Sequence, residues 1–121
     1  EVRARIVAVS NDGVKWDTTY FDNNLPDPVC QGSILTIGKK KKHNILAFSN
    51  AANTKTRDNL TLRISFDDGK TWSKSIVVGK STDDNKDYTA YSDLVQTGKK
   101  TVGILYEFDG YKSIVYKDIK W

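Results

Sequence analysis

The eight residues Ser65–Trp72 constrain the fold of this chain most, because they combine several signals of a closed β-hairpin turn. Strand-like runs flank the stretch on both sides, at Leu60–Ser65 and Ser73–Val78. The pair Asp68-Gly69 favours a tight turn, since glycine readily adopts a positive φ. Asp67 is short enough to accept hydrogen bonds from backbone N–H groups within that turn. The indole of Trp72 is placed to fold back under the turn and bury it. The stretch therefore predicts a self-contained hairpin.

A second, degenerate copy of this pattern lies near the start of the chain, at Val9–Trp16. Counted from its glycine and tryptophan, the copy has Val9 in place of the serine and Asn11 in place of the first aspartate. The two turn glycines, Gly13 and Gly69, are 56 positions apart. Repetition at this period, with strands on either side, favours the blades of a β-propeller over a sandwich.

The remaining sequence reads as short strands with no helical period, which predicts an all-β fold. We expect strands at 3–10, 16–21, 29–37, 44–49, 60–65, 73–78, 90–97, 101–107 and 112–120. Polar linkers at Asp22–Pro28 and Gly79–Asp87 divide them into groups of two, four and three. We expect 29–37 to be an innermost strand buried on both sides. The pattern predicts a partial propeller of about two to three four-stranded blades. In it, residues 1–22 end one blade, 29–79 form a complete blade, and 88–121 give three strands of a final blade.

Composition excludes several classes of function. The hydrophobic content is 38% with no long apolar run, so no membrane segment is expected. No signal peptide is visible and the chain begins in strand-like sequence, which suggests a piece of a larger protein. The net charge of +4 matches the lysine run Lys39–Lys42, which we expect to be a solvated loop rather than a nucleic-acid site. Cys30 and His43 are the only residues of their types, so neither an intrachain disulfide nor a zinc site is expected.

The hairpin stretch resembles the Asp-box, or bacterial neuraminidase repeat, of sialidases, with Ser65, Asp67, Gly69 and Trp72 at its defining positions. In that family the box closes a blade hairpin and takes no part in catalysis, and other propellers carry it too. Further segments resemble the C-terminal third of exo-α-sialidases, in the same order. They are Asp27–Ile34, Leu46–Asn50 ahead of Arg57, Ala90–Leu94 and Ile104–Glu107. The resemblance implies a six-bladed propeller with its active site at the axis and no cofactor.

The resemblance assigns roles to three residues. Arg57 matches one of three family arginines that hold the substrate carboxylate, a task for which a guanidinium fork suits better than lysine. Tyr91 matches the catalytic nucleophile; a neutral phenol avoids the repulsion that a carboxylate nucleophile meets beside the sialoside carboxylate. Glu107 matches a glutamate that orients another arginine. From the residues alone, a solvated loop arginine and an aromatic that fills a strand face are favoured for Arg57 and Tyr91, and an exposed strand-end acid is the alternative for Glu107. Tyr88 is expected to be structural.

Several family residues have no match in this chain. They are the acid/base aspartate, the glutamate that activates the tyrosine and the other two arginines; neither Arg3 nor Arg5 is assigned. We therefore expect the isolated chain to be inactive, although the intact protein would hydrolyse terminal sialic acid from glycoconjugates. The alternative is a non-catalytic Asp-box module that binds glycan or protein. An extracellular, periplasmic or cell-surface location is expected over a cytoplasmic one. Free edge strands would favour association of the fragment with other copies.

Overall fold

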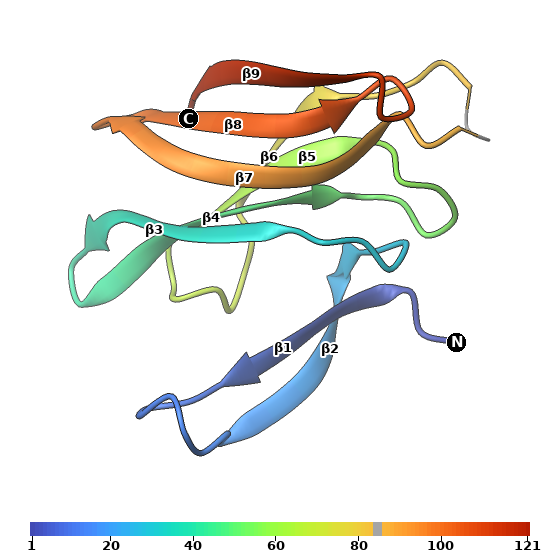
Figure 1. The fold of residues 1–121 in the computed structure, drawn as a ribbon. Helices are drawn as coiled ribbons and strands as arrows, with labels where there is room; N and C mark the ends of the chain where they lie inside the picture. Colours follow the sequence, from blue (N-terminus) through green and yellow to red (C-terminus); the bar gives the residue numbers. More distant parts are fainter. Residues whose placement is uncertain (84–85) are drawn as a thin grey trace.

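The protein is built from antiparallel strands arranged in three sheets, as Figure 1 shows. The structure is a computed structural model that describes residues 1–83 and 86–121. The strands are β1 (Ala4–Val9), β2 (Thr18–Pro26), β3 (Ser33–Lys40), β4 (His43–Ala51), β5 (Leu60–Ser65), β6 (Lys74–Gly79), β7 (Thr89–Gly98), β8 (Thr101–Phe108) and β9 (Ser113–Lys120). They pair in the orders β1-β2, β3-β4-β5-β6 and β7-β8-β9. The predicted all-β fold is confirmed. Among the described residues, no helix is long and apolar enough to cross a membrane.

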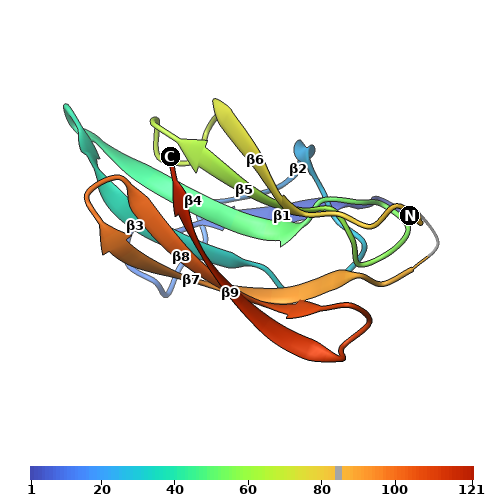
Figure 2. The same cartoon turned by 90° about the horizontal axis from the view of Figure 1, so that it is seen from above.

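The hydrophobic core lies between the second and third sheets. The central strands β4 and β5 are buried on both faces, and their sequences are accordingly rich in apolar residues. Figure 2 shows the third sheet against the second, with β7 in contact with β3 and β4. The main core cluster consists of Ile37, Ile45, Ala47, Leu60, Leu62, Ile64, Val78, Leu94, Val102, Ile104 and Tyr106. These residues span the second and third sheets, so the two sheets fold as one unit.

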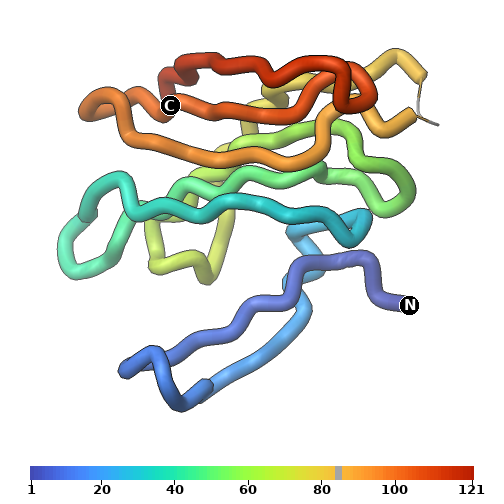
Figure 3. The backbone as a smooth tube through the Cα atoms, in the orientation of Figure 1, coloured from blue at the N-terminus to red at the C-terminus, as the bar shows by residue number. Residues whose placement is uncertain are grey.

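The first sheet is set apart from this core. Within the part of the chain that the structure describes, no residue of β1 or β2 belongs to the core cluster. Figure 3 shows the backbone passing from β2 through residues 27–32 into β3, and this segment ties the two sheets together. The Asn50 side chain adds a second tie, because its amide donates to the carbonyl of Pro26 at 2.8 Å. The guanidinium carbon of Arg5 also lies 5.7 Å from the centroid of the Phe48 ring, so the β1–β2 hairpin is held by its connection and by these contacts.

The β5–β6 turn shows why the stretch 65–72 folds on its own. Asp67 accepts hydrogen bonds from both the backbone N–H of Thr71 at 2.8 Å and its hydroxyl at 2.6 Å. The hydroxyl of Ser65 accepts from the N–H of Gly69 and donates to Asp67. Gly69 has φ +85, which a side chain would strain. These bonds, those from Thr71 first, lower the pKa of Asp67 to about 2. The indole of Trp72 packs 5.6 Å from the Phe48 ring.

The degenerate copy in the β1–β2 turn uses different residues from those expected. Ser10, not Val9, accepts the N–H of Gly13 at 2.8 Å. Asp12, not Asn11, accepts the N–H groups of Val14 and Lys15, both at 2.8 Å. The serine and the aspartate of this turn lie three residues and one residue before the glycine. In the stretch 65–72, Ser65 and Asp67 lie four and two residues before Gly69. Trp16 is 63% exposed and does not plug the turn.

Two expected strands also differ from the structure. The linker expected from Asp22 is strand as far as Pro26, which pairs with Ala4 across a bulge; a proline is tolerated there because β2 has a free edge. The strand expected at 29–37 begins only at Ser33 and is not buried on both sides. Ile34 is 62% exposed, because the first sheet does not pack closely against it.

Candidate active site

Four segments meet at one end of the second and third sheets. They are the β4–β5 loop, the start of β7, the end of β8 and the β8–β9 turn, which lie together on the right in Figure 1. Arg57 comes from the β4–β5 loop, Tyr91 from β7 and Glu107 from β8. A cavity of about 360 Å³ opens beside them, and Tyr91 and Glu107 line it together with Gln31, Ser92, Asp93, Leu105, Tyr106 and Ile114. The fold thus gathers three residues that span 50 positions of sequence.

A β-bulge presents Tyr91 at this end of β7. The register between β7 and β8 shifts between Thr89 and Ser92, which places an extra residue opposite Glu107. The bulged N–H of Tyr91 is removed from the ladder and instead donates to Oε2 of Glu107 at 3.0 Å. The Tyr91 side chain is 47% exposed. Glu107 therefore fixes the backbone that carries an accessible phenol.

Arg57 lies against the face of the same phenol. Its guanidinium carbon is 5.5 Å from the centroid of the Tyr91 ring, a separation at which a cation is attracted to the ring face. The carbonyl of Arg57 accepts from the N–H groups of Tyr88 and Thr89 at 2.9 and 3.0 Å. These bonds hold the β4–β5 loop against the start of β7. Tyr88 takes part in this contact through its backbone N–H, as we expect for a residue with a structural role.

Two residues that the sequence patterns did not single out also contact Arg57. Oδ1 of Asp87 accepts its backbone N–H at 2.8 Å, and the hydroxyl of Tyr111 accepts from Nη1 at 3.3 Å. The Tyr111 hydroxyl in turn donates to Oδ2 of Asp87 at 3.1 Å. The bond from Tyr111 raises the pKa of Arg57, while burial in the first place raises the pKa of Tyr111. The turn residues Asp109-Gly110, which begin two positions after Glu107, are the one sequence signal that places Tyr111 near this site.

Gln31 is a third residue missed by sequence reasoning. Its side-chain amide pairs with the backbone of Ser92, accepting the N–H at 3.1 Å and donating to the carbonyl at 3.0 Å. The hydroxyls of Ser49 and Ser92 lie 2.8 Å apart beneath it. These contacts join the start of the second sheet to β7 next to Tyr91, and so brace the bulge from below.

The single thiol near the site is not arranged as a reactive group. Cys30 is buried, and this burial raises the pKa of its thiol. Its carbonyl accepts a hydrogen bond from Arg5, which also forms an ion pair with Asp27 at 3.0 Å. Among residues 1–83 and 86–121, no group of three His, Cys, Asp or Glu side chains is placed to hold a metal ion.

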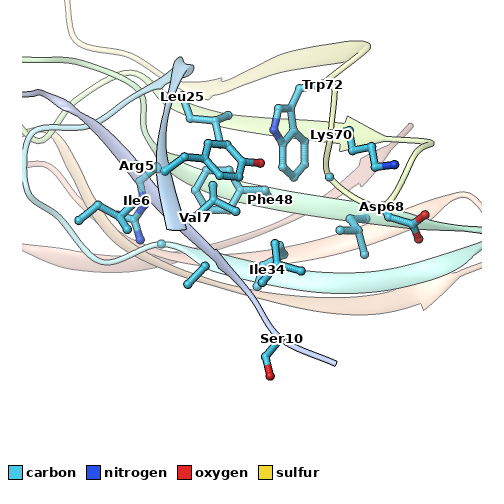
Figure 4. A pocket seen from close by; sticks show the side chains of 16 residues that line it. Arg5, Ile6, Val7, Ser10, Leu25, Ile34, Phe48, Asp68, Lys70 and Trp72 are labelled. Atoms are coloured by element: carbon cyan, nitrogen blue, oxygen red, sulfur yellow. The ribbon is translucent and has the colours of Figure 1, made fainter. Parts of the chain in front are cut away.

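A second, larger cavity of about 540 Å³ separates the first sheet from the second. Figure 4 shows the rings of Phe48 and Trp72 beside each other in it, near Ile34 of β3 and Val7 of β1. Its walls are mainly apolar, and it lies away from Arg57 and Tyr91, neither of which lines it. This cavity is a gap between the first two sheets. Tyr91 and Glu107 line the smaller cavity, whereas Arg57 lines neither cavity and contacts the Tyr91 ring.

The comparisons with known proteins agree on one family. A family model described as a BNR repeat-like domain matches residues 1–105. A sialidase of Bacteroides fragilis (strain YCH46) is 35% identical over 96% of this chain and 22% of its own length. A sialidase of Micromonospora viridifaciens is 36% identical over 85% of this chain and 16% of its own. Among solved structures, Hadza microbial sialidase Hz136 superposes with a TM-score of 0.73 at 27% identity, covering 97% of this chain and 23% of that one.

The chain thus spans about a fifth of the length of these relatives. Sialidases are β-propellers, so the three stacked sheets are a partial β-propeller, as the repeated turn predicted. The relatives are named as sialidases. This chain belongs to the BNR repeat-like domain family and is a sialidase-like module.

Proposed function

We propose that this chain is part of the catalytic domain of an exo-α-sialidase that removes terminal sialic acid from glycoconjugates. The observation that carries the proposal is the contact of Tyr91 with both Arg57 and Glu107, of which Tyr91 and Glu107 line one cavity. The cation of Arg57, the accessible phenol of Tyr91 and the carboxylate of Glu107 lie close together. This arrangement suits a substrate that carries a carboxylate on its reacting carbon.

Arg57 is proposed to bind the substrate carboxylate. A guanidinium offers parallel N–H donors that match the two oxygens of a carboxylate, and such charge-assisted pairs are strong and directional. Its position over the Tyr91 ring would bring that carboxylate, and hence the anomeric carbon attached to it, close to the phenol. Tyr91 then serves as the nucleophile of a retaining double displacement through a tyrosyl–sugar intermediate.

Glu107 is proposed to orient a further arginine. Its Oε2 is engaged by the Tyr91 N–H, and the half-buried carboxylate retains acceptor capacity toward the cavity. A partly desolvated carboxylate is stabilised by a cationic partner, which fits a family arginine. This chain has no match for the residue that deprotonates the phenol, so we expect the isolated 121 residues to be inactive.

The experiment uses the full-length protein that contains this chain and a fluorogenic sialoside. Tyr91→Phe should lower kcat by at least about a thousandfold, whereas Tyr116→Phe, at an exposed phenol on β9 that does not line the cavity, should leave it unchanged. Arg57→Lys should raise KM about tenfold or more, because lysine cannot pair bidentately. A fluorinated sialosyl fluoride that accumulates the covalent intermediate should label Tyr91. Wild-type turnover by Tyr91→Phe, or labelling at another residue, would refute the assignment. Sialoside binding without turnover would favour a glycan-binding module instead.

A further inference from the structure

We propose that Asp87 and Tyr111 are a positioning pair that sets the orientation of the Arg57 guanidinium for binding a carboxylate. The inference rests on the proposed role of Arg57 and adds two residues that neither the sequence motifs nor the comparisons single out. Three hydrogen bonds form a closed ring with Arg57, from its backbone N–H through Asp87 and Tyr111 to its own Nη1.

The pair holds Arg57 both at its backbone and at the tip of its side chain. Asp87 holds the backbone N–H with one carboxylate oxygen at 2.8 Å and the Tyr111 hydroxyl with the other at 3.1 Å. The Tyr111 hydroxyl then accepts from Nη1 at 3.3 Å. An arginine side chain has several rotatable bonds, so a loop arginine without a partner samples many orientations. Hydrogen bonds at the backbone N–H and at the guanidinium restrict the orientations of Arg57 before any ligand binds.

A neutral phenol between the two charges is the important feature of this arrangement. Within the part of the chain that the structure describes, no acid forms an ion pair with Arg57 at 4.0 Å or less. A direct pair with Asp87 would occupy guanidinium donors and cancel part of the charge that a substrate carboxylate needs. Because Asp87 orients the Tyr111 hydroxyl, and this hydroxyl accepts a hydrogen bond from Arg57, the guanidinium is oriented without its charge being neutralised.

The backbone around Tyr111 supports a positioning role. Asp109, Gly110 and Tyr111 have φ values of 52, 62 and 68, and a positive φ is uncommon for a residue as bulky as tyrosine. The Asp109 N–H donates to the carbonyl of Tyr88 at 2.8 Å, which joins this turn to the residue after Asp87. Strained conformations of this kind persist where the surroundings hold them, and they concentrate at functional sites.

The chain contains a matched control. Tyr116 donates to Asp118 at 2.9 Å, and both lie exposed on β9. The bond to Asp118 raises the pKa of Tyr116. Tyr116 thus forms the same kind of phenol–carboxylate pair as Tyr111, but among the described residues no arginine donates a hydrogen bond to it. Changes that are specific to Tyr111 therefore report on Arg57.

The first test measures how the full-length protein discriminates between sialic acid and its methyl ester as inhibitors. Tyr111→Phe and Asp87→Asn should each weaken binding of the free acid about three- to tenfold, with little change for the ester, which lacks the anionic carboxylate. KM should rise more than kcat falls. Tyr116→Phe and Asp118→Asn should leave both inhibition constants unchanged. Equal weakening of acid and ester, or no weakening, would overturn the proposal.

The second test is independent of activity and uses the 121-residue chain labelled with ¹³C at Cζ of tyrosine. Asp87→Asn should lower the pKa of Tyr111, because the carboxylate bond raises it, and Arg57→Gln should raise that pKa, because the cation lowers it. The Tyr116 titration should not move in either variant. Failure of the proposed function appears as Arg57→Lys without effect on sialoside binding. The positioning role is refuted if sialoside binding depends on Arg57 but Tyr111→Phe and Tyr116→Phe have the same effect. It is also refuted if neither Asp87→Asn nor Arg57→Gln changes the pKa of Tyr111.

Discussion

Replacing Asp67 with asparagine removes the negative charge around which the β5–β6 turn is built. The lowered pKa, from 3.8 to about 2, means that the folded turn favours the carboxylate over the acid. At about 1.36 kcal/mol for each pKa unit, the shift corresponds to at most about 2 kcal/mol. The turn is in contact with water, and solvent screening reduces such terms, so we expect a loss of about 1 kcal/mol for Asp67→Asn at neutral pH.

The pH dependence of this loss follows from the direction of the shift. Because the pKa is lower in the folded chain, the contribution of Asp67 is fully present above pH 3.8 and is lost as the pH falls toward 2. Urea unfolding of the wild type and Asp67→Asn should therefore give midpoints that differ at pH 7 and converge near pH 2. Each kcal/mol should also lower Tm by about 4 °C in a chain of this size.

Two threonine variants complete the experiment. Thr71→Val removes one of the bonds to Asp67, the hydroxyl contact at 2.6 Å, and should cost part of the same free energy. Thr97→Val removes a comparable exposed bond to Asp118 at 2.9 Å and should change stability by less than about 0.5 kcal/mol. Identical unfolding midpoints for wild type and Asp67→Asn at pH 7, or a difference that is undiminished at pH 2, would refute the reasoning.

Two further predictions concern packing and association. Gly32→Ala should lower the free energy of unfolding by about 2 kcal/mol or more, since its Cβ would lie 2.6 Å from the backbone carbonyl oxygen of Ser49; differential scanning calorimetry measures the loss, and wild-type stability would contradict it. The isolated chain should associate through its free strand edges, and Ile6→Lys on β1, where the isoleucine is 62% exposed, should shift it toward monomer in light scattering. A monodisperse wild-type monomer at high concentration would count against this association.

The strand pattern was predictable because turn residues mark its boundaries. Glycine and aspartate at 68–69 and 109–110 sit at hairpin turns of the structure, and the two, four and three grouping of strands is confirmed. The end of β2 was not predictable, since a proline argues against a strand only where a ladder bond is needed, and the free edge of β2 needs none. The degenerate turn shows the limit of counting spacings: Ser10 and Asp12 have the same chemistry one residue away.

The candidate site was partly predictable for a different reason. Arg57, Tyr91 and Glu107 were singled out by motif resemblance, and the structure brings them together, while their catalytic roles stay predictions. Asp87 and Tyr111 carry no motif. They meet through a turn in which Tyr111 itself has a positive φ, and no local pattern signals that conformation for a tyrosine. Contacts of this kind depend on tertiary structure alone.

The apolar gap between the first two sheets has a consequence for how the molecule opens. Separating two closely packed layers exposes buried surface, and that cost makes a domain unfold as a whole. Here the cavity of about 540 Å³ separates the β1–β2 hairpin from the second sheet. We therefore expect that movement of the hairpin would not expose the residues of the main core cluster. We therefore expect the β1–β2 hairpin to open separately from the main core, about the connecting residues 27–32. Gln31 of this segment is hydrogen-bonded to the backbone of Ser92, so we expect opening of the hairpin to affect the strand that carries Tyr91.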